Sequence, residues 1–166
     1  MSIEFQTCDL CDAHQNERGD ALRVLPPVFK HFGGRPRFAG QVVTVKCFED
    51  NSLVKQAVEM AGQSRVLVVD GGASLRKALL GGNLAAAAAR NCWAGVLIYG
   101  SVRDVAELRA ADVGICALGL IPMPTQKRGE GQKDCAVDIA GIRIRPDDWL
   151  YADEDGVVVA CTALHQ

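Results

Sequence analysis

Hydrophobic positions in the first two-thirds of the chain switch between a strand-like and a helix-like pattern. Four apolar or alternating runs, at 38–48, 66–69, 94–100 and 114–121, are short and bounded by glycine, proline or polar residues, which predicts strands. The segments beside them predict helices, and Thr7 is the expected N-cap of the first one. The expected helices are 5–15, 52–60, 74–80, 84–90 and 105–110. Alternation of this kind is typical of an α/β fold.

The last third of the chain has a different pattern, in which short apolar runs are separated by turn residues. Expected strands here are 135–139, 142–144, 149–151 and 157–160. The Glu154-Asp155-Gly156 sequence between the last two is a hairpin signal, so we expect this part to be antiparallel. Segment 122–132 is polar and rich in proline and glycine, which predicts a loop, and a composition of this kind is typical of mobile loops. No repeat or linker is found, and one compact domain is expected over residues 1–166.

Composition narrows the classes of function. The 166 residues carry a formal charge of −2 and no basic run, which argues against binding to nucleic acid or a membrane surface. No signal peptide is recognised, and no apolar run reaches the ~20 residues of a membrane span, so a cytoplasmic protein is expected. The seven scattered cysteines do not suggest a disulfide framework. The lone CxxC of Cys8 and Cys11 is interpreted as two thiols on one helix face.

The segment 81–107 carries the candidate chemistry. Gly81 and Gly82 open an alanine-rich helix, a strand follows, and Arg103 and Asp104 stand at the end of that strand. Ligands of α/β proteins bind at the carboxyl ends of strands, where helix N-termini also point. Free backbone N–H groups beside an arginine suit a carboxylate, and a neighbouring acid suits a hard metal ion. The alternative is a helix C-cap followed by a new helix, with Arg103 and Asp104 as a solvated pair.

Other candidate residues give weaker signals. The three histidines, His14, His31 and His165, share no segment with a serine or cysteine nucleophile, so a catalytic triad is not expected. Asp70-Gly71-Gly72 follows a strand but lacks dinucleotide-loop spacing; it is interpreted as a turn, with Asp70 a candidate to face the same cleft. Glu49-Asp50 is interpreted as a solvated turn, with an acid that supports the site from behind as the alternative.

The spacing G-x20-R-D-x2-E, from Gly82 through Arg103 and Asp104 to Glu107, resembles the signature of the RraA-like family. That family comprises regulators of ribonuclease activity and class II 4-hydroxy-4-methyl-2-oxoglutarate aldolases. Several other segments are similar to family segments as well: LCDAHQ, FGGRPRFAGQVVTVKCFEDN, RVLVVDGG, NCWAGVLIYGSVRD and WLYADEDGVVV. The resemblance therefore covers nearly the whole chain.

The resemblance implies a fold, a reaction and an assembly. The implied fold is a three-layer β/β/α sandwich of the swivelling-domain type, assembled as a homotrimer in which segments 49–51 and 122–132 are expected to border a neighbour's site. The implied reaction is a Mg²⁺- or Mn²⁺-dependent cleavage of 4-hydroxy-4-methyl-2-oxoglutarate into two pyruvates, with oxaloacetate decarboxylation beside it. By position, the backbone N–H groups of Gly81, Gly82, Asn83 and Leu84 bind the substrate carboxylate. Arg103 binds the same α-keto acid, and Asp104 holds the metal.

The resemblance also implies a competing function, because the family's regulators bind and inhibit the endonuclease RNase E without chemistry. Two features depart from the aldolases: Asn83 stands where they often carry an acid, and the chain ends at Gln166 without the longer aldolases' C-terminal glutamate. The regulators tend to lack the acid after the arginine, whereas this chain has Asp104. We therefore favour the enzyme over the RNase E regulator.

Overall fold

The structure is a computed structural model that describes residues 3–165, so Gln166 lies outside the described part. Four parallel strands form its centre, in the order β3-β4-β6-β7. Their bounds are Phe38–Lys46 for β3, Val66–Asp70 for β4, Gly95–Val102 for β6 and Gly114–Leu120 for β7. All four were predicted, because a strand buried on both faces has a nearly continuous apolar sequence.

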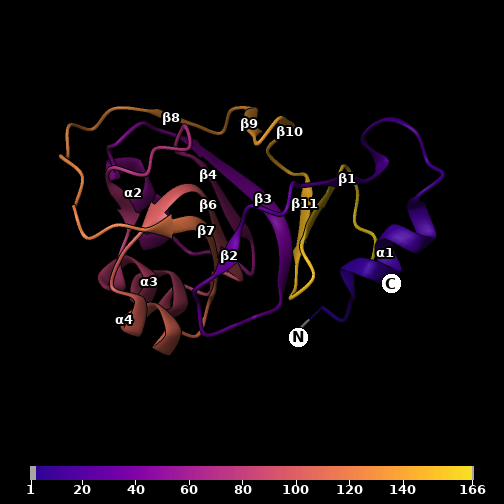
Figure 1. The fold of residues 1–166 in the computed structure, drawn as a ribbon, viewed down its shortest axis with the longest axis horizontal. Helices are drawn as coiled ribbons and strands as arrows, with labels where there is room; N and C mark the ends of the chain where they lie inside the picture. Colours follow the sequence, from indigo (N-terminus) through magenta and orange to yellow (C-terminus); the bar gives the residue numbers. More distant parts are fainter. Residues whose placement is uncertain (1–2, 166) are drawn as a thin grey trace.

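Helices cover one face of this sheet (Figure 1). They are α2 (Ser52–Glu59), α3 (Gly82–Arg90) and α4 (Val105–Ala110). Leu67 and Val69 of β4 face the helices, whereas Val66 and Val68 belong to the core on the opposite side of the sheet. The period of two along β4 therefore divides the interior into two cores.

Antiparallel strands form the layer on the other face. These are β11 (Trp149–Ala152), which pairs with β3, β12 (Val157–Ala160) and β1 (Arg23–Val24). A separate hairpin of β9 (Val137–Ile139) and β10 (Ile142–Ile144) packs into the same core. The predicted β/β/α layers are confirmed. The two β layers are hydrogen-bonded into one curled sheet, because β3 pairs with β4 along one edge and with β11 along the other.

The expected helix over 74–80 is wrong. Residues Ala78–Leu80 form strand β5, which pairs in parallel with β6, and Ala78 donates its N–H to the Met123 carbonyl. All three β5 residues are buried, so tertiary pairing outweighs a modest helix propensity. Gly81 and Gly82 consequently begin helix α3 instead of ending an earlier helix.

Four further short elements were not predicted, and strand β1 is one of them. Strand β2 (Lys30–His31) pairs with β7, and β8 (Gln132–Lys133), at the end of the expected loop 122–132, pairs with β3. A single 3-10 turn, η1, covers Gly19–Ala21. Within residues 3–165, no helix combines the length and apolar character needed to cross a membrane.

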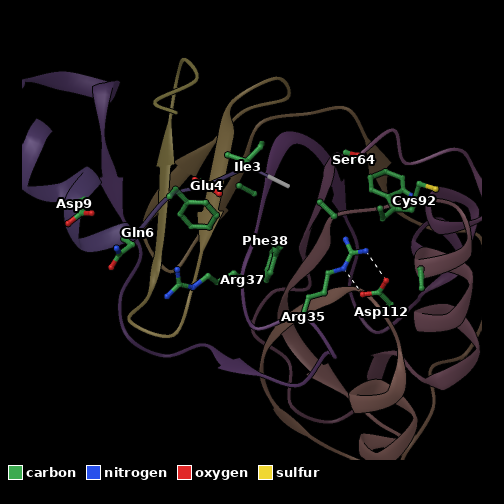
Figure 2. A pocket seen from close by; sticks show the side chains of 15 residues that line it. Ile3, Glu4, Gln6, Asp9, Arg35, Arg37, Phe38, Ser64, Cys92 and Asp112 are labelled. Atoms are coloured by element: carbon green, nitrogen blue, oxygen red, sulfur yellow. Dashed lines mark hydrogen bonds and ion pairs between the residues drawn. The ribbon is translucent and has the colours of Figure 1, made fainter. Parts of the chain in front are cut away.

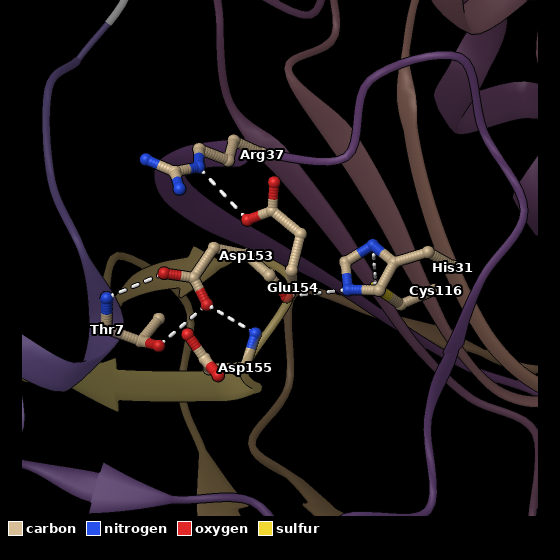
Figure 3. A network of polar contacts seen from close by, with 7 residues as sticks. All are labelled: Thr7, His31, Arg37, Cys116, Asp153, Glu154 and Asp155. Atoms are coloured by element: carbon tan, nitrogen blue, oxygen red, sulfur yellow. Dashed lines mark hydrogen bonds and ion pairs between the residues drawn. The ribbon is translucent and has the colours of Figure 1, made fainter.

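The N-terminal helix α1 (Thr7–His14) is held to the antiparallel layer by a buried carboxylate. Asp153 accepts hydrogen bonds from the Thr7 N–H and hydroxyl, both at 2.7 Å, and from the Asp155 N–H at 2.9 Å (Figure 3). Thr7 was expected to be the N-cap, but Gln6 occupies that position. Burial opposes the ionisation of Asp153, but hydrogen bonds from Thr7, Asp155 and Gly156 outweigh it and lower its pKa. One carboxylate thus fixes both α1 and the β11–β12 turn.

Replacing Thr7 by valine keeps the side-chain volume and removes one donor to this carboxylate. We expect Thr7→Val to lower the free energy of unfolding by about 1.5–3 kcal/mol at pH 7, because hydrogen bonds to charged groups are worth that much. Because folding lowers the pKa of Asp153 from 3.8, its ionised form stabilises the fold above pH 3.8, and this stabilisation is lost as the pH falls further. The difference in unfolding free energy between Thr7→Val and the wild type should therefore shrink below pH 3.8. Urea unfolding checks this, with Thr162→Val, at an exposed position, as control; equal stability of the two variants would contradict it.

Candidate active site

A cavity of about 490 Å³ lies at the carboxyl edge of the parallel strands, and all six predicted site residues line it. Gly81, Gly82, Asn83 and Leu84 belong to the β5–α3 turn and the first turn of α3, while Arg103 and Asp104 follow β6. Strand β5 pairs with the end of β6, which brings the two turns together. Gly81 and Gly82 begin helix α3 and are not the C-cap of an earlier helix, and Asp104 is bonded to Gly82, so it is not an unrelated surface residue.

Asp104 joins the two turns directly. Its Oδ2 atom accepts the Gly82 N–H at 2.9 Å and lies 3.9 Å from Arg103 Nε. Arg103 also donates from Nη1 to the Pro122 carbonyl at 3.3 Å. Asp104 has a left-handed backbone, with φ of 62° and ψ of 50°, a conformation that aspartate tolerates better than most residues. Both side chains are about 40% exposed, so each can reach a ligand.

The structure changes one detail of the expected carboxylate site. Four N–H groups, those of residues 81–84, were expected to face the substrate, but the Gly82 N–H already donates to Asp104. The next two N–H groups, those of Asn83 and Leu84, belong to the first turn of α3, where no helical carbonyl is available to accept them. The free donors of the cavity are therefore expected at Asn83 and Leu84.

Glycine is required at position 82 because α4 approaches α3 closely there. A Cβ atom on Gly82 would lie 1.5 Å from Glu107 Oε2 and 2.8 Å from Glu107 Cβ. At Gly81, a Cβ atom would lie 2.7 Å from Asp104 Oδ2. The two glycines thus leave space for two carboxylates beside the start of α3.

Of these two carboxylates, Asp104 lines the cavity and is the candidate ligand for a divalent cation. Within residues 3–165, no group of three or more His, Cys, Asp or Glu side chains is placed to hold a metal ion. Mg²⁺ is commonly held by only one or two carboxylates and completes its shell with water and substrate oxygens. Asp104 would therefore suffice as the protein ligand of a Mg²⁺ or Mn²⁺ ion in this cavity.

The opposite wall of the cavity was not predicted. It is formed by Asn51 after β3 and by Thr125 and Lys127 of the loop that follows β7. Asn51 donates its N–H to the Thr125 hydroxyl, which in turn donates to Asn51 Oδ1 at 2.8 Å. These segments line the cavity of their own chain, and their expected place beside a neighbour's site stays a prediction. Sequence reasoning missed them because 74 residues separate the two partners.

Asp50 anchors this wall and is not part of a solvated turn. It is fully buried, and its carboxylate accepts the N–H and hydroxyl of Ser52 and the N–H groups of Arg128 and Glu130. Burial opposes its ionisation, but these hydrogen bonds outweigh that effect and lower its pKa from 3.8 to about 2. The ionised carboxylate of Asp50 thus accepts hydrogen bonds from the backbone of the loop 122–132 and anchors that loop.

A larger hollow of about 1210 Å³ contains none of the predicted residues (Figure 2). Phe38, Ser64, Ala94 and Asp112 place it at the amino edge of the parallel strands. Arg35 and Asp112, its prominent charged pair, bind each other through two hydrogen bonds of 2.6 and 2.9 Å. We prefer the smaller cavity as the active site because it lies at the carboxyl edge, where α/β proteins bind ligands.

The remaining candidates lie away from the cavity. His14 pairs with Glu17, His31 with the Asp153 carbonyl and His165 with the Tyr151 hydroxyl. None of the three histidines lines the cavity. Asp70 does not line the cavity either, and its carboxylate accepts the Gly72 N–H in a turn. The expectation that Asp70 faces the same cleft is wrong.

Comparison with known proteins decides the family. The family model described as RraA-like (Aldolase/RraA) matches residues 7–159. This chain belongs to the RraA-like family. A curated relative from Albidiferax ferrireducens is named "Putative 4-hydroxy-4-methyl-2-oxoglutarate aldolase". It is 63% identical to this chain over 172 residues, and the alignment covers 99% of each sequence. The resemblance inferred from the sequence is confirmed.

Two solved structures confirm the fold but carry different names. The RNA-processing inhibitor RraA from Thermus thermophilus is 46% identical, with a TM-score of 0.89 over 96% of this chain and 94% of that one. An S-adenosylmethionine:2-dimethylmenaquinone methyltransferase from Geobacillus kaustophilus is 43% identical, with a TM-score of 0.91 over 96% and 97%. Since one fold carries an aldolase, an inhibitor and a methyltransferase name, the site residues must decide the function.

The close approach of α3 and α4 gives a test of the site's construction. We expect Gly82→Ala to lower the free energy of unfolding by about 1–3 kcal/mol, because the added methyl group overpacks the contact with Glu107. Gly119→Ala is the control, since no atom lies within 4 Å of a Cβ placed there. Chemical unfolding of the two variants measures the difference, and an unchanged stability of Gly82→Ala would show that α4 moves freely away from α3.

Proposed function

We propose that this protein is a divalent-metal-dependent lyase that cleaves 4-hydroxy-4-methyl-2-oxoglutarate into two pyruvates. The observation that carries the proposal is the convergence of Arg103, Asp104 and the first turn of α3 on one cavity. Similarity to relatives that are named as this aldolase supports the same reaction. Decarboxylation of oxaloacetate is proposed as a second activity because it passes through the same pyruvate enolate.

The reaction requires a group that stabilises negative charge on the keto oxygen. In the cleavage, the C4 hydroxyl loses its proton and becomes a carbonyl, and the C3–C4 bond breaks. The bonding electrons move to the keto oxygen and form an enolate, whose C3 atom then takes up a proton to give the second pyruvate. In oxaloacetate, carbon dioxide leaves instead and the electrons reach the same oxygen. A bound Mg²⁺ or Mn²⁺ would supply Lewis acidity at this oxygen.

The chain's own residues divide the remaining tasks. Arg103 is always charged and planar, so it can donate to the oxygen on which charge develops. The N–H groups of Asn83 and Leu84 bind and orient the carboxylate next to the keto group. Asp104 would hold the cation. Its hydrogen bond from the Gly82 N–H also keeps the two turns together. The amide of Asn83 cannot act as a base, so we assign both proton transfers to water in the open cavity.

The setting that we propose for this reaction is a cytoplasmic homotrimer, on the strength of the family resemblance. The competing proposal is a regulator that binds RNase E, and it is supported by 46% identity to the RNA-processing inhibitor RraA. We favour the lyase because a regulator that acts only by binding has no need of a carboxylate held beside an arginine inside a cavity.

Loss of Asp104 should abolish metal-dependent turnover. We expect Asp104→Ala to release no pyruvate from 4-hydroxy-4-methyl-2-oxoglutarate or oxaloacetate at any Mg²⁺ concentration that saturates the wild type. Asp12→Ala, which removes an exposed carboxylate outside the cavity, should retain full activity. Pyruvate is measured by a coupled assay, with and without Mg²⁺. Wild-type protein that shows no turnover but inhibits RNase E would favour the regulator.

Loss of Arg103 should slow the chemical step. We expect Arg103→Ala to lower kcat by on the order of 10²–10³, as for other donors to a developing oxyanion. Arg18→Ala, at an exposed position away from the cavity, is the matched control. Steady-state kinetics separates the outcomes, since a change confined to KM would assign Arg103 to substrate binding alone.

A further inference from the structure

The candidate cavity is larger than a pyruvate unit requires. Pyruvate has six non-hydrogen atoms and displaces roughly three waters, or about 90 Å³ at ~30 Å³ per water. The cavity measures about 490 Å³. Besides Arg103 and Asp104, where the pyruvate unit is proposed to bind, the cavity is lined by Asn51, Thr125 and Lys127.

That wall is held in place along its length. The Pro122 carbonyl accepts a hydrogen bond from Arg103, and Pro124 forms a bridge with Ala78 of β5. Thr125 binds Asn51, and the N–H of Arg128 donates to the buried carboxylate of Asp50 at 2.8 Å. The backbone on both sides of Lys127 is therefore fixed, so its position relative to the cavity does not depend on a loose loop.

The charges around the cavity favour a ligand with more than one negative group. Four cationic side chains and two anionic ones line it: Lys55, Arg90, Arg103 and Lys127, with Glu59 and Asp104. A surplus of positive charge in a concave site raises the local concentration of anions. Mg²⁺ bound at Asp104 would increase this surplus.

Among these cations, Lys127 is the best placed to bind a second carboxylate. Arg103 lies 3.9 Å from the carboxylate of Asp104, and Lys55 lies 3.9 Å from that of Glu59. Arg90 ends helix α3, about 12 Å from Gly82 at ~1.5 Å per residue. Within residues 3–165, Lys127 forms no ion pair with a carboxylate. It therefore carries an uncompensated charge on the wall that faces the spare volume.

We propose that Lys127 binds the second carboxylate of a dicarboxylic 2-oxo acid whose pyruvate end lies at Arg103 and Asp104. The inference rests on the proposed function and adds a determinant of substrate specificity to it. In 4-hydroxy-4-methyl-2-oxoglutarate this carboxylate keeps its charge while the C3–C4 bond breaks. The contact is then equally strong in the ground state and the transition state, so its loss raises KM and leaves kcat nearly unchanged.

Two assays on the Mg²⁺-loaded protein separate the roles of the two ends of the cavity. The first is the steady-state cleavage of 4-hydroxy-4-methyl-2-oxoglutarate. The second is the exchange of pyruvate methyl protons in deuterium oxide, followed by NMR, which needs the enolate but no second carboxylate. We expect Lys127→Met to raise KM for cleavage by about 10- to 100-fold, the equivalent of one hydrogen bond to a charged group, with proton exchange within twofold of the wild type.

Two further variants control for charge and folding. Lys127→Arg should recover most of the affinity, and Lys133→Met, on exposed strand β8 away from the cavity, should behave as the wild type. An unchanged KM in Lys127→Met would overturn the proposal, as would parallel losses of cleavage and exchange. Wild-type protein that shows neither cleavage nor exchange with Mg²⁺ would instead overturn the proposed lyase function itself.

Discussion

The hydrogen bond from the Gly82 N–H to Asp104 is the contact on which the candidate site depends. It joins the start of α3 to the turn that follows β6, two segments separated by 22 residues. The contact forms only because glycine at 81 and 82 leaves room for the carboxylates of Asp104 and Glu107. A side chain at position 82 would meet Glu107, including its Cβ at 2.8 Å, so either Glu107 or helix α4 would have to move.

Two buried aspartates extend the same principle to the rest of the molecule. Asp50 fixes the loop that walls the cavity, and Asp153 fixes helix α1 and the β11–β12 turn. In both cases an ionised side chain accepts several hydrogen bonds from segments far apart in the sequence, which offsets the cost of burying its charge. Irregular backbone is thus held by carboxylates, while the sheet and helices are held by apolar packing.

The difference between these two kinds of stabilisation explains which features the sequence could predict. The central strands were predicted because burial on both faces leaves a continuous apolar sequence, as in β4. Strand β5 was misassigned, since three residues give no period and only pairing with β6 makes them a strand. Arg103, Asp104 and the glycines were found because one helix and one strand separate them, a spacing that resembles the family signature. Asp50, Thr125 and Lys127 were missed because their meeting depends on long-range contacts that leave no pattern in the sequence.

The backbone of Asp104 bears on the choice between an enzyme and a binding protein. Nine non-glycine residues within 3–165 have a left-handed backbone, and Asp104 is the one among them that lines the cavity. The Asp104 carboxylate accepts the Gly82 N–H and lies 3.9 Å from Arg103 Nε. Selection for a cation and an oxo acid held between two turns would maintain this geometry, together with the glycines that make it possible.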